Sequence, residues 1–240
     1  MANATKLQFL LRVKKNGRAK YISQREFLNI IEQSVRRADI PIIFSEGFNP
    51  RPRLSFTTAL SVGVSSDDEV IYLQLSEWLN PKDILQEINK NLIENIIIST
   101  VEPCMPLRQD TLNHIKPYQK NYKENTISNH ITNGFNVEYK ITPLNDMTSN
   151  ELLKLSHEKI ENWMNQKNQM IQREYINKNF KEINIRNYVQ KIELKNDLLF
   201  LTVKITNEGT ARPNEIILSL GLSGNLQDGS FSIHKIKTFI

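Results

Sequence analysis

Cysteine is almost absent from this chain of 240 residues, in which Cys104 stands alone. One cysteine forms no disulfide within the chain, and this content is typical of a protein from the reducing cytoplasm. An iron–sulfur cluster needs several cysteine thiolates as ligands, so the chain excludes cluster chemistry of its own. We interpret Cys104 as a small, partly buried apolar residue, because no base that would activate its thiol follows from the sequence.

Long apolar runs are missing as well. The run from Leu7 to Leu11 is too short for a membrane span or for the core of a signal peptide, and basic residues follow it directly. We therefore expect a cytoplasmic protein with no membrane partner. With only 8 glycines and 9 prolines, the sequence also argues against long disordered linkers.

Catalytic and metal-binding motifs are lacking too. There is no P-loop, no GxGxxG fingerprint and no GxSxG nucleophile elbow. We expect no catalytic constellation, no bound metal and no cofactor, because the histidines are isolated from one another and from Cys104. These histidines are His114, His130, His157 and His234.

Positive charge is concentrated at one end of the sequence. Residues 1–60 hold 11 Lys and Arg against 4 Asp and Glu, a net charge of +7, whereas residues 61–240 hold 20 against 22. Two interpretations remain open: a solvated surface with lysine-rich strands, or a docking face for phosphate groups or an acidic partner.

Hydrophobic periodicity predicts an α+β domain at residues 5–103. Ser23 and Glu26 form a capping box, and apolar residues at helical spacing follow it. Asn80 with Pro81 marks the start of a second helix. The order strand, helix, strand, strand, helix, strand predicts a ferredoxin-like βαββαβ unit. The expected strands are 7–13, 54–60, 69–76 and 96–101.

The same element order recurs, with additions, at residues 135–240. Residues 104–134 are predicted to be a linker or crossing segment. A second capping box, Thr148 with Glu151, predicts one helix that extends to Met164. The fold class expected for the whole chain is therefore α+β, with two tandem ferredoxin-like units of which the second is decorated.

The most unusual stretch is residues 45–53, in which Gly47 and two prolines constrain a loop. This loop presents Phe48, Asn49, Arg51 and Arg53. Arginine suits phosphate or carboxylate, and an aromatic ring offers a stacking face for a base. Phe48 as a core plug, with exposed arginines around it, is the alternative.

Basic residues also flank the predicted start of the first helix. Lys20 and Arg25 lie on either side of Ser23, at a helix N-terminus that favours anions. We therefore expect the ligand-binding residues to be those of the loop together with this pair, whereas Tyr21 and Ser23 take structural roles. The expected site is Lys20, Arg25, Phe48, Asn49, Arg51 and Arg53.

Several short motifs together resemble the radical SAM-linked protein family, a bacterial domain fused to a radical S-adenosylmethionine (SAM) enzyme or encoded beside one. The motifs are Tyr21-Ile22-Ser23, Arg36-Arg37-Ala38, Ile40-Pro41, Ser45, Gly47-Phe48-Asn49-Pro50, Pro52, Leu54-Ser55-Phe56, Leu60-Ser61-Val62-Gly63-Val64, Glu182-Ile183-Asn184-Ile185-Arg186 and Ala211-Arg212-Pro213-Asn214-Glu215. The resemblance covers nearly the whole chain. It implies a radical SAM protein as partner, and relatives encoded near ribosomal-protein and RNA-processing genes favour RNA as a ligand.

This chain departs from the family pattern at three positions. Gln24 and Arg51 stand where the family usually has histidine, and Asn29 stands where it usually has arginine. Glutamine exchanges no proton near neutral pH, so the departures favour binding over acid–base catalysis.

We therefore expect an accessory protein of a radical SAM enzyme that binds RNA, with transfer RNA as one candidate, through its basic N-terminal face. One alternative is a scaffold that binds the radical SAM partner without nucleic acid. Another is a metal-independent RNA-processing enzyme, for which Tyr21, Ser23 and Arg51 are the nearest candidate residues.

Overall fold

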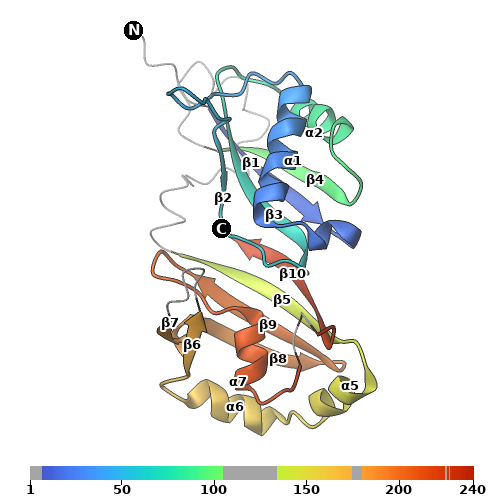
Figure 1. Cartoon of the computed structure of the whole chain (residues 1–240), viewed down its shortest axis with the longest axis vertical. Helices are drawn as coiled ribbons and strands as arrows, with labels where there is room; N and C mark the ends of the chain where they lie inside the picture. Colours follow the sequence, from blue (N-terminus) through green and yellow to red (C-terminus); the bar gives the residue numbers. More distant parts are fainter. Residues whose placement is uncertain (1–6, 105–133, 175–179, 225, 227) are drawn as a thin grey trace. The chain divides into compact units, whose positions relative to one another are not determined.

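The computed structural model describes residues 7–104, 134–174, 180–224, 226 and 228–240. The chain divides into two compact units, residues 1–131 and 132–240. Each unit combines helices with antiparallel strands, and the described ranges contain five α-helices (Figure 1). None of these helices is long and apolar enough to cross a membrane. The predicted linker at 104–134 lies, apart from its two end residues, outside the described residues.

The first unit has the predicted order of strands and helices. Strand β1 pairs with β3 on one side and with β4 on the other, and β2 pairs with β3, so the order across the sheet is β4-β1-β3-β2. All three pairings are antiparallel. The elements are β1 (Leu7–Lys15), the 3-10 helix η1 (Gly17–Tyr21), α1 (Gln24–Arg37), β2 (Leu54–Phe56), β3 (Ser65–Leu75), α2 (Pro81–Lys90) and β4 (Ile96–Cys104).

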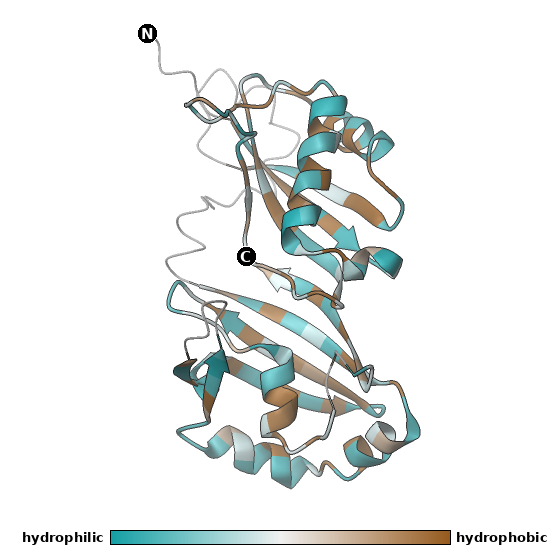
Figure 2. Ribbon diagram, viewed as in Figure 1, coloured by the Kyte–Doolittle hydropathy of each residue, from teal (hydrophilic) through white to brown (hydrophobic). Residues whose placement is uncertain are grey.

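Alternation along the strands and the apolar stripe of α1 together build the core of this unit. Figure 2 shows the apolar and polar residues alternating along the strands. The predicted capping box is confirmed: the Glu26 N–H donates to Ser23 Oγ at 3.2 Å, and the Ser23 N–H donates to the Glu26 carboxylate at 2.7 Å. The helix therefore begins directly before the apolar residues that it buries, of which Phe27 is the first. That core includes Phe9, Leu11, Phe27, Ile31, Val35, Ile71, Leu73, Ile84 and Ile88.

The second unit contains a sheet of order β10-β5-β9-β8 and a separate two-stranded ribbon, β6-β7, with every pair antiparallel. Arg212 lies at the N-cap of α7, with Pro213 as the first helical residue. The elements are β5 (Phe135–Pro143), α5 (Asp146–Leu153), α6 (His157–Asn165), β6 (Met170–Glu174), β7 (Phe180–Asn184), the 3-10 helix η3 (Ile185–Tyr188), β8 (Val189–Lys195), β9 (Leu198–Ile205), α7 (Pro213–Ser219) and β10 (Phe231–Phe239).

The capping box predicted at Thr148 is wrong. Asn145 caps α5 instead, because its side chain accepts a hydrogen bond from the Thr148 N–H at 2.9 Å. The Thr148 side chain is fully buried, and its hydroxyl donates to the Ser230 carbonyl. The single long helix that was predicted is two helices, with Ser156 capping the second.

Candidate nucleic-acid interface

The loop at residues 45–53 is closed at its base and open at its tip. The Ser45 N–H donates to the Arg51 carbonyl at 2.8 Å, and the Arg51 N–H donates back to Ser45 Oγ at 3.0 Å. At the tip, Phe48 is fully exposed and Asn49 is exposed beside it. Phe48 is therefore no core plug. The structure instead places an aromatic ring in solvent on a loop that is tied at both ends.

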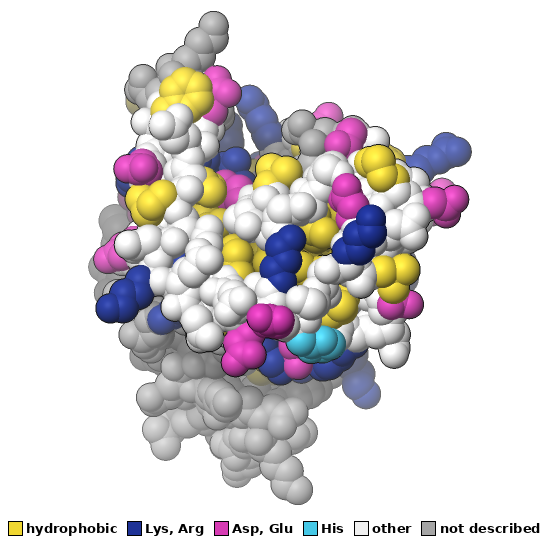
Figure 3. Space-filling model, turned by 90° about the horizontal axis from the view of Figure 1, so that it is seen from below, with side chains coloured by type: hydrophobic (Ala, Val, Ile, Leu, Met, Phe, Trp, Pro, Cys, Tyr) yellow, Lys and Arg dark blue, Asp and Glu magenta, His cyan; other side chains and the backbone are white. Residues whose placement is uncertain are grey.

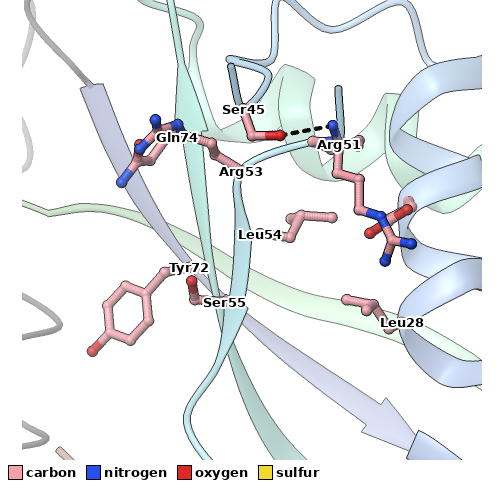
Figure 4. A pocket seen from close by; sticks show the side chains of 10 residues that line it. Leu28, Ser45, Arg51, Arg53, Leu54, Ser55, Tyr72 and Gln74 are labelled. Carbon is pink, nitrogen blue, oxygen red and sulfur yellow. Dashed lines mark hydrogen bonds between the residues drawn. The ribbon is translucent and has the colours of Figure 1, made fainter. Parts of the chain in front are cut away.

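Arg51 and Arg53 line a hollow of about 510 Å³ but extend in different directions. Figure 4 shows the exposed Arg51 side chain extending from the loop toward α1, near Leu28, and the Arg53 side chain pointing the other way. Arg53 is half-buried, and its Nε has no hydrogen-bond partner among the residues that the structure describes. Arg51 is thus the arginine of this pair that is open to a ligand.

Helix α1 adds one basic and one acidic group beside the loop. The Arg36 guanidinium lies 4.8 Å from the ring centroid of Phe44, just before the loop. Glu32 lines the same hollow as Arg51, one turn earlier along α1. Residues three and four apart share a helix face, so Arg25, Leu28, Glu32 and Arg36 follow one another along this side of α1.

Lys20 and Arg25 lie at the other end of α1, away from the loop. The Lys20 ammonium lies 5.0 Å from the ring centroid of Tyr21, and Arg25 is exposed in the first turn of the helix. The Lys20 carbonyl accepts a hydrogen bond from the Gly63 N–H at 2.8 Å. The six predicted site residues therefore form two groups, one at the N-terminal end of α1 and one on the loop farther along this helix, and not one cluster.

Gln24 and Ser23 both hold the start of α1 in place. The Gln24 side-chain oxygen accepts a hydrogen bond from the Leu60 N–H at 3.2 Å, which ties the segment after β2 to the helix. Because the Ser23 hydroxyl accepts from Glu26, it acts as a cap. Tyr21, Ser23 and Arg51 are the residues named above for an RNA-processing enzyme. Tyr21 and Ser23 lie at the helix start, whereas Arg51 lines the hollow with Leu28 and Glu32 farther along α1.

The family comparison gives one match across most of the chain. Residues 8–213 match the model of the family described as "Uncharacterized protein conserved in bacteria (DUF2344)". The chain belongs to this DUF2344 family. A comparison with curated proteins finds no match.

A buried lysine that the sequence did not single out lies beneath the start of α1 in this DUF2344 chain. Lys15 has no exposed surface, its Nζ donates to the Ile22 carbonyl at 2.9 Å, and it lies 5.3 Å from the Phe27 ring centroid. Burial lowers the pKa of Lys15, and the charge of Glu69, which is itself buried, opposes that shift. The sequence indicated the burial of Lys15, because this residue continues the alternation of inward-facing residues Phe9, Leu11 and Val13 along β1.

In the second unit, two residues of the family motifs, Glu215 and Arg186, are bonded to neighbouring parts of the chain. Arg173 of β6 donates to the Glu215 carboxylate at 2.7 and 2.5 Å and to the Thr210 carbonyl at 2.8 Å. Arg186 donates to the Met164 carbonyl at 2.8 Å. These side chains link the β6-β7 ribbon and η3 to their neighbours, which is a structural role.

Charges on the second unit are mixed. Figure 3 views the molecule from the end at which α5 and α6 lie, and acidic and basic side chains are interspersed over it. This agrees with the nearly balanced charge of residues 61–240. Among the residues that the structure describes, no group of three or more His, Cys, Asp and Glu is placed to hold a metal ion. His114 and His130 lie outside those residues.

Cys104 is expected to resist thiol reagents in the folded protein. It is buried at the end of β4, and burial, followed by the charge of Glu102, raises the pKa of its thiol to about 12. The thiolate is the reactive form, so very little of it is present at neutral pH. Titration with a chromogenic disulfide reagent at pH 7 should be slow in buffer and complete within minutes in urea. Equal rates in both solutions would contradict this placement.

Proposed function

We propose that this DUF2344 chain binds RNA through the side of α1 that faces the loop, and that it presents this RNA to a radical SAM enzyme. The observation that carries the proposal is the fully exposed Phe48 beside the exposed Arg51. An aromatic ring offers a stacking face to any base, and a guanidinium fork matches a phosphate. The net charge of +7 over residues 1–60 supplies the long-range attraction for a polyanion.

The radical SAM partner follows from the resemblance of the motifs. The family motifs around Tyr21, Phe48 and Leu60 lie in the chain segments beside α1. This is the same surface that we assign to RNA. Because the single Cys104 holds no iron–sulfur cluster, the radical chemistry would reside in the partner.

We also infer that each unit is a ferredoxin-like unit. Numbered within each unit, and with the β6-β7 ribbon left out as an insertion, both sheets have the antiparallel order 4-1-3-2. This order is what a split βαβ arrangement produces. In the first unit, this arrangement places α1 over one face of the sheet and β2 at the edge of the sheet, next to the loop.

Binding to bulk transfer RNA is expected to weaken steeply as salt is raised. Each phosphate contact contributes about 0.7 to the slope of log affinity against log salt for single strands. The Arg51→Ala variant should bind more weakly and lower that slope by about this amount. Fluorescence anisotropy between 50 and 300 mM salt, roughly the range over which such contacts are lost, measures both quantities.

The matched control is Lys82→Ala, which removes one exposed positive charge from α2 of the same unit. It should leave both the affinity and the slope near those of the unchanged protein. The absence of RNA binding at low salt would overturn the proposal and leave the protein-scaffold alternative. Binding that is reduced equally by Arg51→Ala and Lys82→Ala would show that the loop has no special role.

A further inference from the structure

A second exposed aromatic ring, Tyr21, lies at the N-terminal end of α1, whereas Phe48 lies on the loop that begins beside the C-terminal end of this helix. Tyr21 is 63% exposed, although it lies in η1 between buried residues and the start of α1. Lys20 covers one part of its ring at 5.0 Å, and the exposed Arg25 follows in the first turn of the helix. Tyr21 is therefore presented with two cations close by, just as Phe48 is presented with Arg51.

A continuous seam joins these two ends, because the chain from Phe44 to Leu60 runs alongside α1 in the opposite direction. The contacts follow one another in order along the helix. At the C-terminal end of α1, Arg36 contacts the Phe44 ring, and Glu32 and Leu28 then line the hollow together with Arg51 and Leu54. Nearer the N-terminal end, the ring centroids of Phe27 and Phe56 are 5.3 Å apart. At the first residue of the helix, the Gln24 side chain accepts the hydrogen bond from the Leu60 N–H at 3.2 Å.

We propose that this seam binds a segment of single-stranded RNA, with Tyr21 and Phe48 each stacking on a base at its two ends. The inference rests on the proposed RNA-binding function and names its substrate class. Bases in an RNA duplex are stacked on one another, so they offer no free face to either ring. Arg25 and Arg36 of α1, together with Arg51 of the hollow, supply cations for the phosphates.

The length of α1 gives the scale of that segment. A helix of 14 residues is about 21 Å long at 1.5 Å per residue. Stacked nucleotides rise about 3.4 Å along one strand, so about six of them reach from one end of the helix to the other. Engagement of both rings by one strand raises the affinity because the second contact becomes intramolecular.

A length series of unstructured RNA tests the inference. Fluorescence anisotropy with RNAs of about four, six, eight and twelve nucleotides should show a steep rise in affinity between four and eight, followed by a plateau. Tyr21→Ala should remove this rise and weaken the eight-nucleotide RNA at least about fivefold, while Tyr21→Phe, which keeps the ring, should not. A 12-base-pair RNA duplex, at roughly one helical turn, should bind more weakly than the single strand.

Failure of this inference is distinguishable from failure of the proposed function. If duplex and single strand bind alike, or if affinity grows evenly with length and Tyr21→Ala has no effect, the seam is not the binding site, although RNA binding that Arg51→Ala weakens would still stand. If no RNA of any length binds, both proposals are overturned.

Discussion

Lys15→Met is expected to destabilise the first unit by about 1–3 kcal/mol, because it removes a buried positive charge from the vicinity of the buried Glu69 carboxylate. Lys15 and Glu69 are both almost completely buried, at 0% and 1% exposure, and the charge of Glu69 favours the charged form of Lys15. The variant also removes the hydrogen bond from Lys15 to the Ile22 carbonyl, directly before the cap of α1. Since small domains are stable by about 5–15 kcal/mol, this is a large fraction of the total, and urea unfolding followed by circular dichroism measures it.

Two variants separate the loss of the charge pair from other effects. Lys14→Met changes the same charge on the neighbouring, exposed residue of β1 and should stay within about 0.5 kcal/mol of the unchanged protein. The double variant Lys15→Met/Glu69→Gln removes both charges, so it should recover much of the loss. A single variant as stable as Lys14→Met would contradict the burial of Lys15, and an additive double variant would show that the two charges are independent.

The start of α1 and the order of elements in the first unit follow from sequence patterns that act locally. A capping box and an apolar stripe specify where a helix begins and which side it buries, and both depend on residues within a few positions. The cap at Thr148 fails for a tertiary reason. Thr148 is buried inside the first turn, where its hydroxyl donates to Ser230, far away in the sequence, as well as to Asn145, and the Asn145 side chain caps the helix.

The candidate site was predictable as a list of residue types but not as an arrangement. The constrained loop identified Phe48 and Arg51, yet whether an aromatic ring is buried or exposed depends on whether neighbouring elements cover it, which no local pattern reports. For the same reason the opposite directions of Arg51 and Arg53 did not follow from their spacing. The sequence assigned Tyr21 a structural role, whereas its exposed ring makes it a binding candidate.

The Phe48→Ala/Arg51→Ala double variant is expected to lose about 2–4 kcal/mol of RNA binding, roughly a 30- to 700-fold rise in Kd. Base stacking on one aromatic ring contributes about 1–3 kcal/mol, and a hydrogen bond to a charged group contributes a similar amount. Both side chains are exposed, so the variant should fold normally and retain its melting temperature. Anisotropy with an eight-nucleotide RNA measures the loss, and thermal unfolding provides the check on folding.

Two conservative changes distinguish recognition of bases from general attraction or apolar docking. Phe48→Leu keeps an exposed apolar side chain but has no aromatic face, so it should weaken RNA binding nearly as much as Phe48→Ala does. Arg51→Lys keeps the charge but loses the planar fork, so it should keep the salt dependence and lose affinity. If Phe48→Leu binds RNA as the unchanged protein does, the ring does not stack on bases. An exposed leucine that suffices would favour an apolar contact with a protein partner.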